Sequence, residues 1–274
     1  MIVKAPKKIA SLIGETSPYL FENAEKIDFN QSSTEIPLYK SFESYEKENF
    51  SDLLKILSTL GSLSLANELK TNDKRYFLGE RLRIRKISYT QPSGLLSVKI
   101  ASQLESSQKG RALIEIVDEN TKIFQMEMDY FIIDEPSFNK IFESHYSAEQ
   151  NKAFTSVFPS SSFEYLNEEK FNITIEEFTR NHCLGHFDNY EIVPAAFVGK
   201  CILKNIFESS TDPNLEIENI EIFLNKAMPI NTVFTVNVKI LRVSKNLKKY
   251  KCTVTDTKTE YGHYFITIKN QPTF

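Results

Sequence analysis

Several features that would point directly to a class of protein are missing from this sequence. There is no tryptophan, and the three cysteines, Cys183, Cys201 and Cys252, form no CxxC pair. An odd number of separated cysteines argues against a disulfide framework and favours a reducing compartment. No apolar run reaches the roughly 18 residues that a spanning helix needs, and the first residues contain no apolar core of signal-peptide length. We therefore expect a cytoplasmic protein without a membrane span.

Markers of nucleic-acid, nucleotide and metal binding are also absent. The formal net charge is −3, which argues against nucleic acid because neutralising phosphates requires a basic excess. The lysine-rich run at 245–251 is interpreted as solvated surface. The sequence has no P-loop, glycine-rich dinucleotide fingerprint or HExxH motif. His182 and His186 precede the helix-starting Pro194, so they lie in a loop and do not form a helical metal pair. No cofactor and no metal are expected.

What the chain does have is a polar, histidine-bearing stretch that leads into a very apolar helix. The stretch runs from Asn181 to Pro194 and contains His182, Gly185 and His186. Proline suits the first turn of a helix, so Pro194 predicts a helix from Ala195 to about Glu208. That helix is apolar on most sides, which predicts burial in a core or under a sheet. Lys200, in the middle of it, is its most unusual residue.

The organisation of the chain repeats at a constant offset of 138 residues. Leucines at helical spacing predict a helix over 46–70, and alternating patterns predict four strands over 75–133. A second helix and a second meander follow, and Gly61 aligns with Gly199, Leu82 with Ile220, and Asp118 with Asp256. A helix laid across each antiparallel meander predicts an α+β fold with the two sheets merged edge to edge. We expect the halves to span 1–145 and 146–274.

This arrangement resembles the hotdog fold in its double form. The run Gly185-His186-Phe187, followed by Val193-Pro194 at the start of the helix, is similar to the histidine loop of 3-hydroxyacyl-[acyl-carrier-protein] dehydratases. Residues 220–229 look like the strand and proline turn that follow in that family. The resemblance covers 171–269, and 46–133 fits as a degenerate copy without the histidine. It implies two central helices, each wrapped by its half of a long sheet, and an acyl thioester as ligand.

The resemblance also implies a catalytic pair. In such dehydratases a histidine removes a proton next to the thioester, and a carboxylic acid on the helix protonates the leaving hydroxyl. Carried onto this chain, the histidine is His186 and the acid position is Lys200, or Ser62 in the first repeat. Neither is a carboxylate, so the pair is incomplete. An ammonium at Lys200 would either reach solvent or hold a carboxylate or a thioester carbonyl.

Three functions follow from the resemblance. The first is a dehydratase-like protein of fatty-acid or polyketide-type synthesis, with His186 as the base. The second is an acyl thioesterase, because the run from Gly185 to Asn189 also looks like the loop of hotdog thioesterases, in which Asp188 would activate water. Asp188 as a cap of the turn is an equally good interpretation. The third is a non-catalytic subunit that binds acyl chains or another hotdog protein.

The expected site is therefore a groove between the two repeats. The proposed catalytic residues are His186, Asp188 and Lys200, and the proposed substrate-binding residues are Phe187, Val193, Pro194, Phe197 and His182. The expected partners are acyl carrier protein or a coenzyme A thioester, and a second hotdog chain, identical or different.

Overall fold

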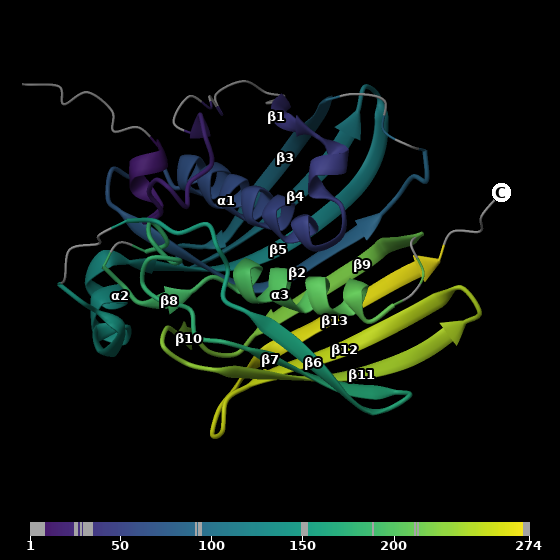
Figure 1. Cartoon of the computed structure of the whole chain (residues 1–274). Helices are drawn as coiled ribbons and strands as arrows, with labels where there is room; N and C mark the ends of the chain where they lie inside the picture. Colours follow the sequence, from purple (N-terminus) through teal and green to yellow (C-terminus); the bar gives the residue numbers. More distant parts are fainter. Residues whose placement is uncertain are drawn as a thin grey trace, which may run out of the picture.

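The computed structural model describes residues 9–24, 27, 29, 35–90, 92, 95–148, 153–187, 189–210, 212 and 214–270 (Figure 1). The helices are α1 (Phe50–Glu68), α2 (Glu135–Ile141) and α3 (Ala195–Glu208). The first-half strands are β1 (Glu35–Ser41), β2 (Arg75–Lys86), β3 (Leu95–Ser106), β4 (Lys109–Asp118) and β5 (Thr121–Asp134). The later strands are β6 (Ser161–Asn167), β7 (Lys170–Ile175), β8 (Ile192–Val193), β9 (Leu215–Leu224), β10 (Met228–Pro229), β11 (Phe234–Ser244), β12 (Leu247–Thr255) and β13 (Glu260–Asn270).

One long antiparallel sheet carries both halves of the described chain. Its order is β1-β3-β4-β5-β2-β9-β13-β12-β11-β7-β6, and β8 pairs separately with β10. Each half contributes a meander, and the two meanders join where β2 pairs with β9. Helices α1 and α3 lie next to each other over one face of this sheet (Figure 1). The two predicted helices and the two predicted meanders are therefore present.

The seam between β2 and β9 has a local two-fold pseudo-symmetry. Arg83 lies opposite Glu221 and is separated from it by 138 residues in sequence, the offset of the repeat. Leu82 faces Ile222 and Ile84 faces Ile220. The 138-residue offset relates Leu82 to Ile220 and Ile84 to Ile222, so it converts each of these two pairs into the other. Because equivalent residues meet in antiparallel register, the pseudo-axis passes between Arg83 and Glu221, whose side chains form an ion pair of 3.3 Å.

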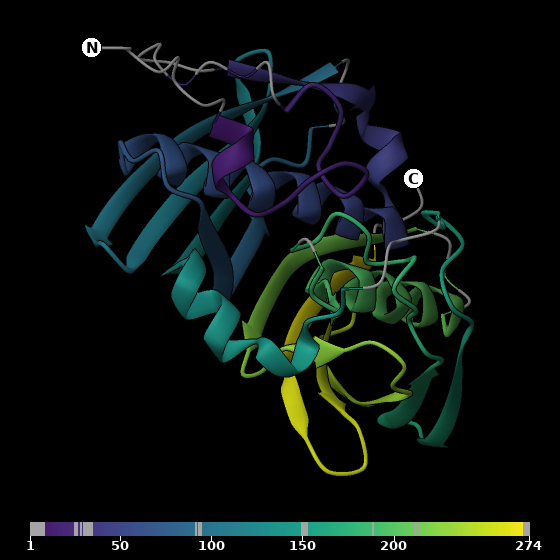
Figure 2. The ribbon, with the colours of Figure 1, turned by 90° about the vertical axis from the view of Figure 1, so that its left-hand side faces the viewer.

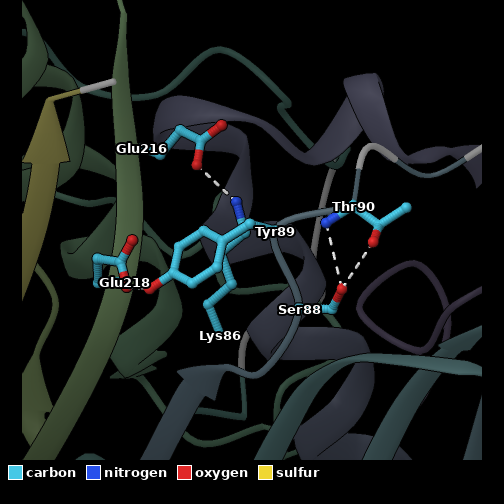
Figure 3. A network of polar contacts seen from close by, with 6 residues as sticks. All are labelled: Lys86, Ser88, Tyr89, Thr90, Glu216 and Glu218. Carbon is cyan, nitrogen blue, oxygen red and sulfur yellow. Dashed lines mark hydrogen bonds and ion pairs between the residues drawn. The ribbon is translucent and has the colours of Figure 1, made fainter. Parts of the chain in front are cut away.

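Polar contacts tie the far end of this seam (Figure 3). Lys86, at the end of β2, donates to Glu216 on β9 at 2.5 Å. The Tyr89 hydroxyl donates to Glu218 at 2.6 Å, and Ser88 and Thr90 bond each other in the same turn. Polar contacts therefore join β2 and β9 at this end of the seam. At the other end, residues of both strands line a cavity.

The helices are buried because their apolar residues recur at 3–4 spacing. On α1 the residues Leu53, Leu57 and Leu60 have no exposed surface, and on α3 Val198, Ile202 and Ile206 have none. Burying a leucine or isoleucine side chain contributes about 1.5–3 kcal/mol, so these stripes fix both helices on the sheet. No helix in the described part of the chain is long and apolar enough to cross a membrane.

Two parts of the fold lie in regions where the sequence shows little period. The described part of the first 46 residues contains the edge strand β1 and two short 3-10 helices, at Ile9–Leu12 and Phe42–Tyr45, which both contact α1. The predicted connector 134–165 contains α2 and most of the edge strand β6. Helix α2 runs between the strands of the two halves at the cavity end of the seam (Figure 2).

Candidate active site

The histidine loop before α3 is held in an unusual conformation against the N-terminal segment. Gly185 has φ +87°, and Phe187 and Asn189 have φ of 56° and 64°, in the left-handed region that side chains disfavour. The Thr16 amide donates to the Gly185 carbonyl at 2.8 Å, and Glu15 forms an isolated antiparallel bridge with His186. The loop and the segment therefore position each other.

An aromatic cluster anchors the same loop from its other side. The Phe187 ring packs edge-on against Tyr76 at 5.6 Å and Phe138 at 5.3 Å between ring centroids. Tyr76 and Phe138 stack on each other at 3.6 Å, and Tyr190 completes the cluster. Edge-to-face packing of this kind adds about 0.5–1.5 kcal/mol per pair beyond burial. This packing offsets the strain at Phe187 and fixes its neighbour His186.

A substitution of Gly185 tests this mutual positioning. An added Cβ at Gly185 would lie 2.3 Å from the Thr16 carbonyl oxygen, a backbone atom that cannot turn away. We expect Gly185→Ala to lower the free energy of unfolding by about 2–3 kcal/mol, because it combines this clash with a left-handed φ. Denaturant unfolding of the variant measures this. Leu184→Ala, at the partly exposed neighbouring position, is the matched control, and equal losses in the two variants would contradict the account.

A cavity of about 550 Å³ opens beside the loop, between the two halves. Its apolar walls come from both halves of the long sheet, from α1 and from β10: Leu54, Phe77, Leu78, Leu82, Met128, Phe131, Ile222, Leu224 and Met228. Its polar groups include Glu15, Lys55, Ser58, Ser62, Tyr130 and His186. The size and the mostly apolar lining are those of a site for a small organic ligand.

Glu15 is a buried carboxyl group in this cavity. It is 8% exposed, and its Oε2 accepts a hydrogen bond of 2.7 Å from the Thr59 hydroxyl on α1. Burial raises the pKa of Glu15 to about 7, against the opposing effects of the Thr59 bond and the Lys55 charge. A carboxyl group with a pKa near 7 can both take and give a proton at neutral pH.

His186 faces Glu15 across the antiparallel bridge. Directly paired residues of antiparallel strands point to the same side, and the side chains of Glu15 and His186 both line the cavity. His186 Nδ1 lies 3.2 Å from the Ile192 carbonyl, which only accepts, so we assign the proton to Nδ1 and the lone pair to Nε2. Burial lowers the pKa of His186 to about 4, which keeps the imidazole neutral at pH 7.

A lysine on α1 supplies a positive charge to the same cavity. Lys55 Nζ donates to the Tyr19 carbonyl at 2.9 Å and lies 4.7 Å from the centre of the Tyr19 ring. Burial lowers the pKa of Lys55, whereas the negative charges of Asp52 and Glu15 oppose that change. The cavity thus combines a titrating carboxyl, a neutral imidazole and a cation from three separate segments.

The structure brings together some of the predicted site residues and separates others. Phe187 and Val193 line the cavity with His186, whereas Phe197, Pro194 and His182 do not. Phe197 packs against Phe158 with 5.0 Å between ring centroids. Pro194 caps α3. His182 accepts from the Thr179 amide at 2.9 Å through Nδ1 and contacts the Val157 carbonyl through Nε2. Asp188 lies outside the described residues.

Lys200 is engaged elsewhere, and its repeat equivalent is in the cavity. Lys200 Nζ donates to Asp52 at 2.7 Å and does not line the cavity. Ser62, at the equivalent position on α1, does line it and donates to the Ser58 carbonyl at 3.2 Å. The helix therefore brings no acid to this position. The carboxyl groups that line the cavity are those of Glu15, which is buried, and Glu80, which is exposed.

Sequence reasoning did not select Glu15. The residue belongs to a segment without helical or strand period, and it is far in sequence from both α1 and the histidine loop. The available signal was a single acid in the otherwise uncharged run from Ile9 to Leu20. The thiols, by contrast, stay inert: burial raises the pKa of Cys183 and of Cys201 to about 12, so neither is a thiolate at neutral pH.

Comparison with known proteins gives the fold. A protein assigned as an oleoyl thioesterase from Lactobacillus plantarum aligns over 89% of this chain and 99% of its own, with a TM-score of 0.57 and 8% identity. A protein assigned as a thioesterase II from Thermobifida fusca aligns over 90% of this chain and 95% of its own, with a TM-score of 0.55 and 8% identity. The 12:0-ACP thioesterase from Umbellularia californica aligns over 89% of this chain and 100% of its own, with a TM-score of 0.53 and 9% identity. No protein-family model and no curated protein sequence matches. The chain has the hotdog fold, and the three similar structures are described as thioesterases and not as dehydratases.

Proposed function

We propose that this protein is an acyl thioesterase in which Glu15 activates the attacking water. The observation that carries the proposal is the pairing of Glu15, with its pKa raised to about 7, and the neutral His186 at the polar end of an apolar cavity. The names of the three similar structures give independent support, since each is described as a thioesterase. In this proposal Glu15 takes the role that the sequence suggested for Asp188, and it supplies the acid that is missing at Lys200, the acid position of the helix in the family.

The proposed reaction uses each of the three cavity groups. The acyl chain occupies the apolar part, and the thioester carbonyl lies beside Glu15, His186 and Lys55. A water donates hydrogen bonds to the Glu15 carboxylate and to His186 Nε2. As its oxygen attacks the carbonyl carbon, one proton passes to Glu15 and the other stays on the attacking oxygen. The Lys55 ammonium stabilises the negative oxygen that forms. Collapse breaks the carbon–sulfur bond, and Glu15 returns its proton to the leaving sulfur, which gives a carboxylic acid and a thiol.

We also propose that the halves 1–145 and 146–274 are two hotdog repeats and that the substrate enters where they meet. The support is the pseudo-two-fold seam and the contribution of both halves to the cavity wall. In this layout Ser62 and Lys200 are the equivalent helix positions of two related sites. Lys200 and Asp52 form an ion pair at the second one.

Dehydration of a 3-hydroxyacyl thioester is the second candidate, and one observation favours it. Glu15 and His186 are a carboxylic acid and a neutral imidazole facing one cavity, the pair that such a dehydration requires. In that reaction His186 Nε2 would remove the proton next to the thioester, and protonated Glu15 would protonate the leaving hydroxyl.

One assay separates the two candidates. Long-chain saturated and 3-hydroxyacyl thioesters are incubated with the protein, and both free thiol and conjugated enoyl product are followed. We expect thiol release from both substrates without enoyl product. Enoyl formation without thiol release would establish the second candidate, and no product from either substrate would refute both.

His186 is expected to contribute to either reaction. We expect His186→Ala to lower kcat/KM about 100-fold, because the reacting group loses its hydrogen-bond partner at Nε2. His263→Ala is the matched control, since that ring lies on β13 and bonds Glu260 at 3.0 Å outside the cavity. Equal activity of the His186→Ala variant and the wild-type protein would show that the reaction takes place elsewhere.

A further inference from the structure

Cations and aromatic rings form a belt on the outer face of the sheet, in which Glu221 lies between Phe265 and Arg83 and forms an ion pair with Arg83. We define this cationic belt as Lys170, Lys239, Lys249, Lys251, Phe265, Phe223 and Arg81. The Arg81 guanidinium lies 5.1 Å from the Phe223 ring centre, and the Phe223 and Phe265 rings meet edge-on at 5.9 Å. Lys249 and Lys251 lie 5.3 and 5.9 Å from the centre of Phe265.

The lysines at one end of the belt face one another directly. Lys239 on β11 is paired in register with Lys251 on β12 and with Lys170 on β7, and all three are exposed. Like charges that face each other across neighbouring strands are destabilising. No carboxylate in the described part of the chain lies within 4.0 Å of these three ammonium groups. Glu164 is on the same face of β6, opposite Asn172 and one step along from Lys170.

The other end of the belt reaches the cavity. Arg81 lines the cavity mouth, together with Lys226 on the turn after β9. The belt crosses six neighbouring strands, from β7 to β2. At about 4.8 Å between strands it is roughly 24 Å long, the length of a helix of between four and five turns. Carboxylates one turn apart on a helix are about 5–6 Å apart, which matches the spacing of the lysine row.

We propose that the cationic belt docks an acidic helical carrier protein that delivers the acyl group as a thioester. The inference rests on the proposed thioesterase function and names the carrier. An acidic helix lying across the strands neutralises the facing lysines, and a thioester arm extending past Arg81 enters the cavity. The lysine-rich run at 245–251, interpreted from sequence as solvated surface, here contributes Lys249 and Lys251 to a binding surface.

The test compares one acyl group on two carriers. Thiol release is measured with the acyl group on an acidic acyl carrier protein and on coenzyme A. We expect Lys239→Glu/Lys251→Glu to lower kcat/KM for the carrier-protein substrate at least tenfold, mainly through KM, and to leave the coenzyme A substrate within twofold. Lys99→Glu/Lys109→Glu makes the same change of charge on exposed residues of β3 and β4, and we expect less than a twofold effect with either substrate.

A binding measurement separates failure of the docking surface from failure of the proposed function. Calorimetric titration of the wild-type chain with the carrier protein at 50 and 300 mM NaCl is expected to show binding that weakens with salt and is lost in the reversed variant. If the charge-reversed variant Lys239→Glu/Lys251→Glu does not fold, the neutral variant Lys239→Gln/Lys251→Gln replaces it and is expected to weaken binding about threefold. Unchanged carrier binding in the folded variant would overturn the proposal. Equal losses of kcat/KM with the carrier-protein and coenzyme A substrates would also overturn the proposal. The proposal would fail as well if the charge-reversed variant lost binding to vesicles containing phosphatidylserine and still bound the carrier protein.

Discussion

Replacing Glu15 with glutamine is expected to lower kcat for thioester hydrolysis roughly 1000-fold, with little change in KM. Glutamine keeps the size of the side chain and still accepts the hydrogen bond from Thr59, but it cannot take a proton from water. The measurement is thiol release under saturating substrate. Glu22→Gln, at an exposed position of the same segment, is the control and is expected to retain full activity.

The pH dependence gives the same prediction a second readout. Because the Glu15 carboxylate is the base and its pKa is about 7, kcat/KM of the wild-type protein should rise with pH and be half-maximal near pH 7. His186 has a pKa of about 4 and stays neutral throughout, so it adds no second transition above pH 5. The residual activity of Glu15→Gln should lack the transition near pH 7. A variant that kept both the rate and the transition would show that another group is the base.

The same substitution is expected to stabilise the protein at alkaline pH. The pKa of Glu15 is raised from 4.5 in the unfolded chain to about 7 in the folded protein, so its contribution to stability is present below about pH 4.5 and is lost as pH rises through 7. At pH 8 the wild-type protein therefore bears a cost of about 3 kcal/mol that glutamine does not. Urea unfolding at pH 8 should show Glu15→Gln more stable by about this amount, with the difference vanishing near pH 4.5.

His186 makes the opposite contribution in an overlapping range. Its pKa is lowered from 6.5 to about 4, so its stabilising effect is present above pH 6.5 and is lost as pH falls toward 4. In the wild-type protein the two groups nearly compensate between pH 4.5 and 6.5. Without Glu15 the stability should rise with pH across this interval. A Glu15→Gln variant with the same pH dependence as the wild-type protein would mean that Glu15 is not buried as described.

Sequence patterns were sufficient for the parts of the fold in which burial is periodic. The leucine stripe of α1 and the alternation of the meander strands each reflect one buried face, and the two-fold seam follows the 138-residue offset. The offset also placed the family's acid position at Ser62 in the first repeat, and Ser62 does line the cavity.

The remaining parts depend on contacts between distant segments. Strand β1 pairs with β3 at a sheet edge, where the alternation is interrupted by Pro37 and a register shift. Glu15 gains its chemistry from Thr59 on α1 and from burial beside His186, and no local pattern encodes either contact. The ion pair of Lys200 with Asp52 likewise joins two helices, so its sequence position alone did not show that the lysine is occupied.

The most direct test of the proposed site is a crystal structure of the protein bound to a non-hydrolysable acyl thioether, in which a methylene replaces the thioester carbonyl. The account predicts that this methylene lies in van der Waals contact with a water that is hydrogen-bonded to Glu15 and His186. The acyl chain should run along Phe77, Met128 and Ile222. A ligand bound elsewhere, with the cavity between the halves filled by side chains or water, would contradict it.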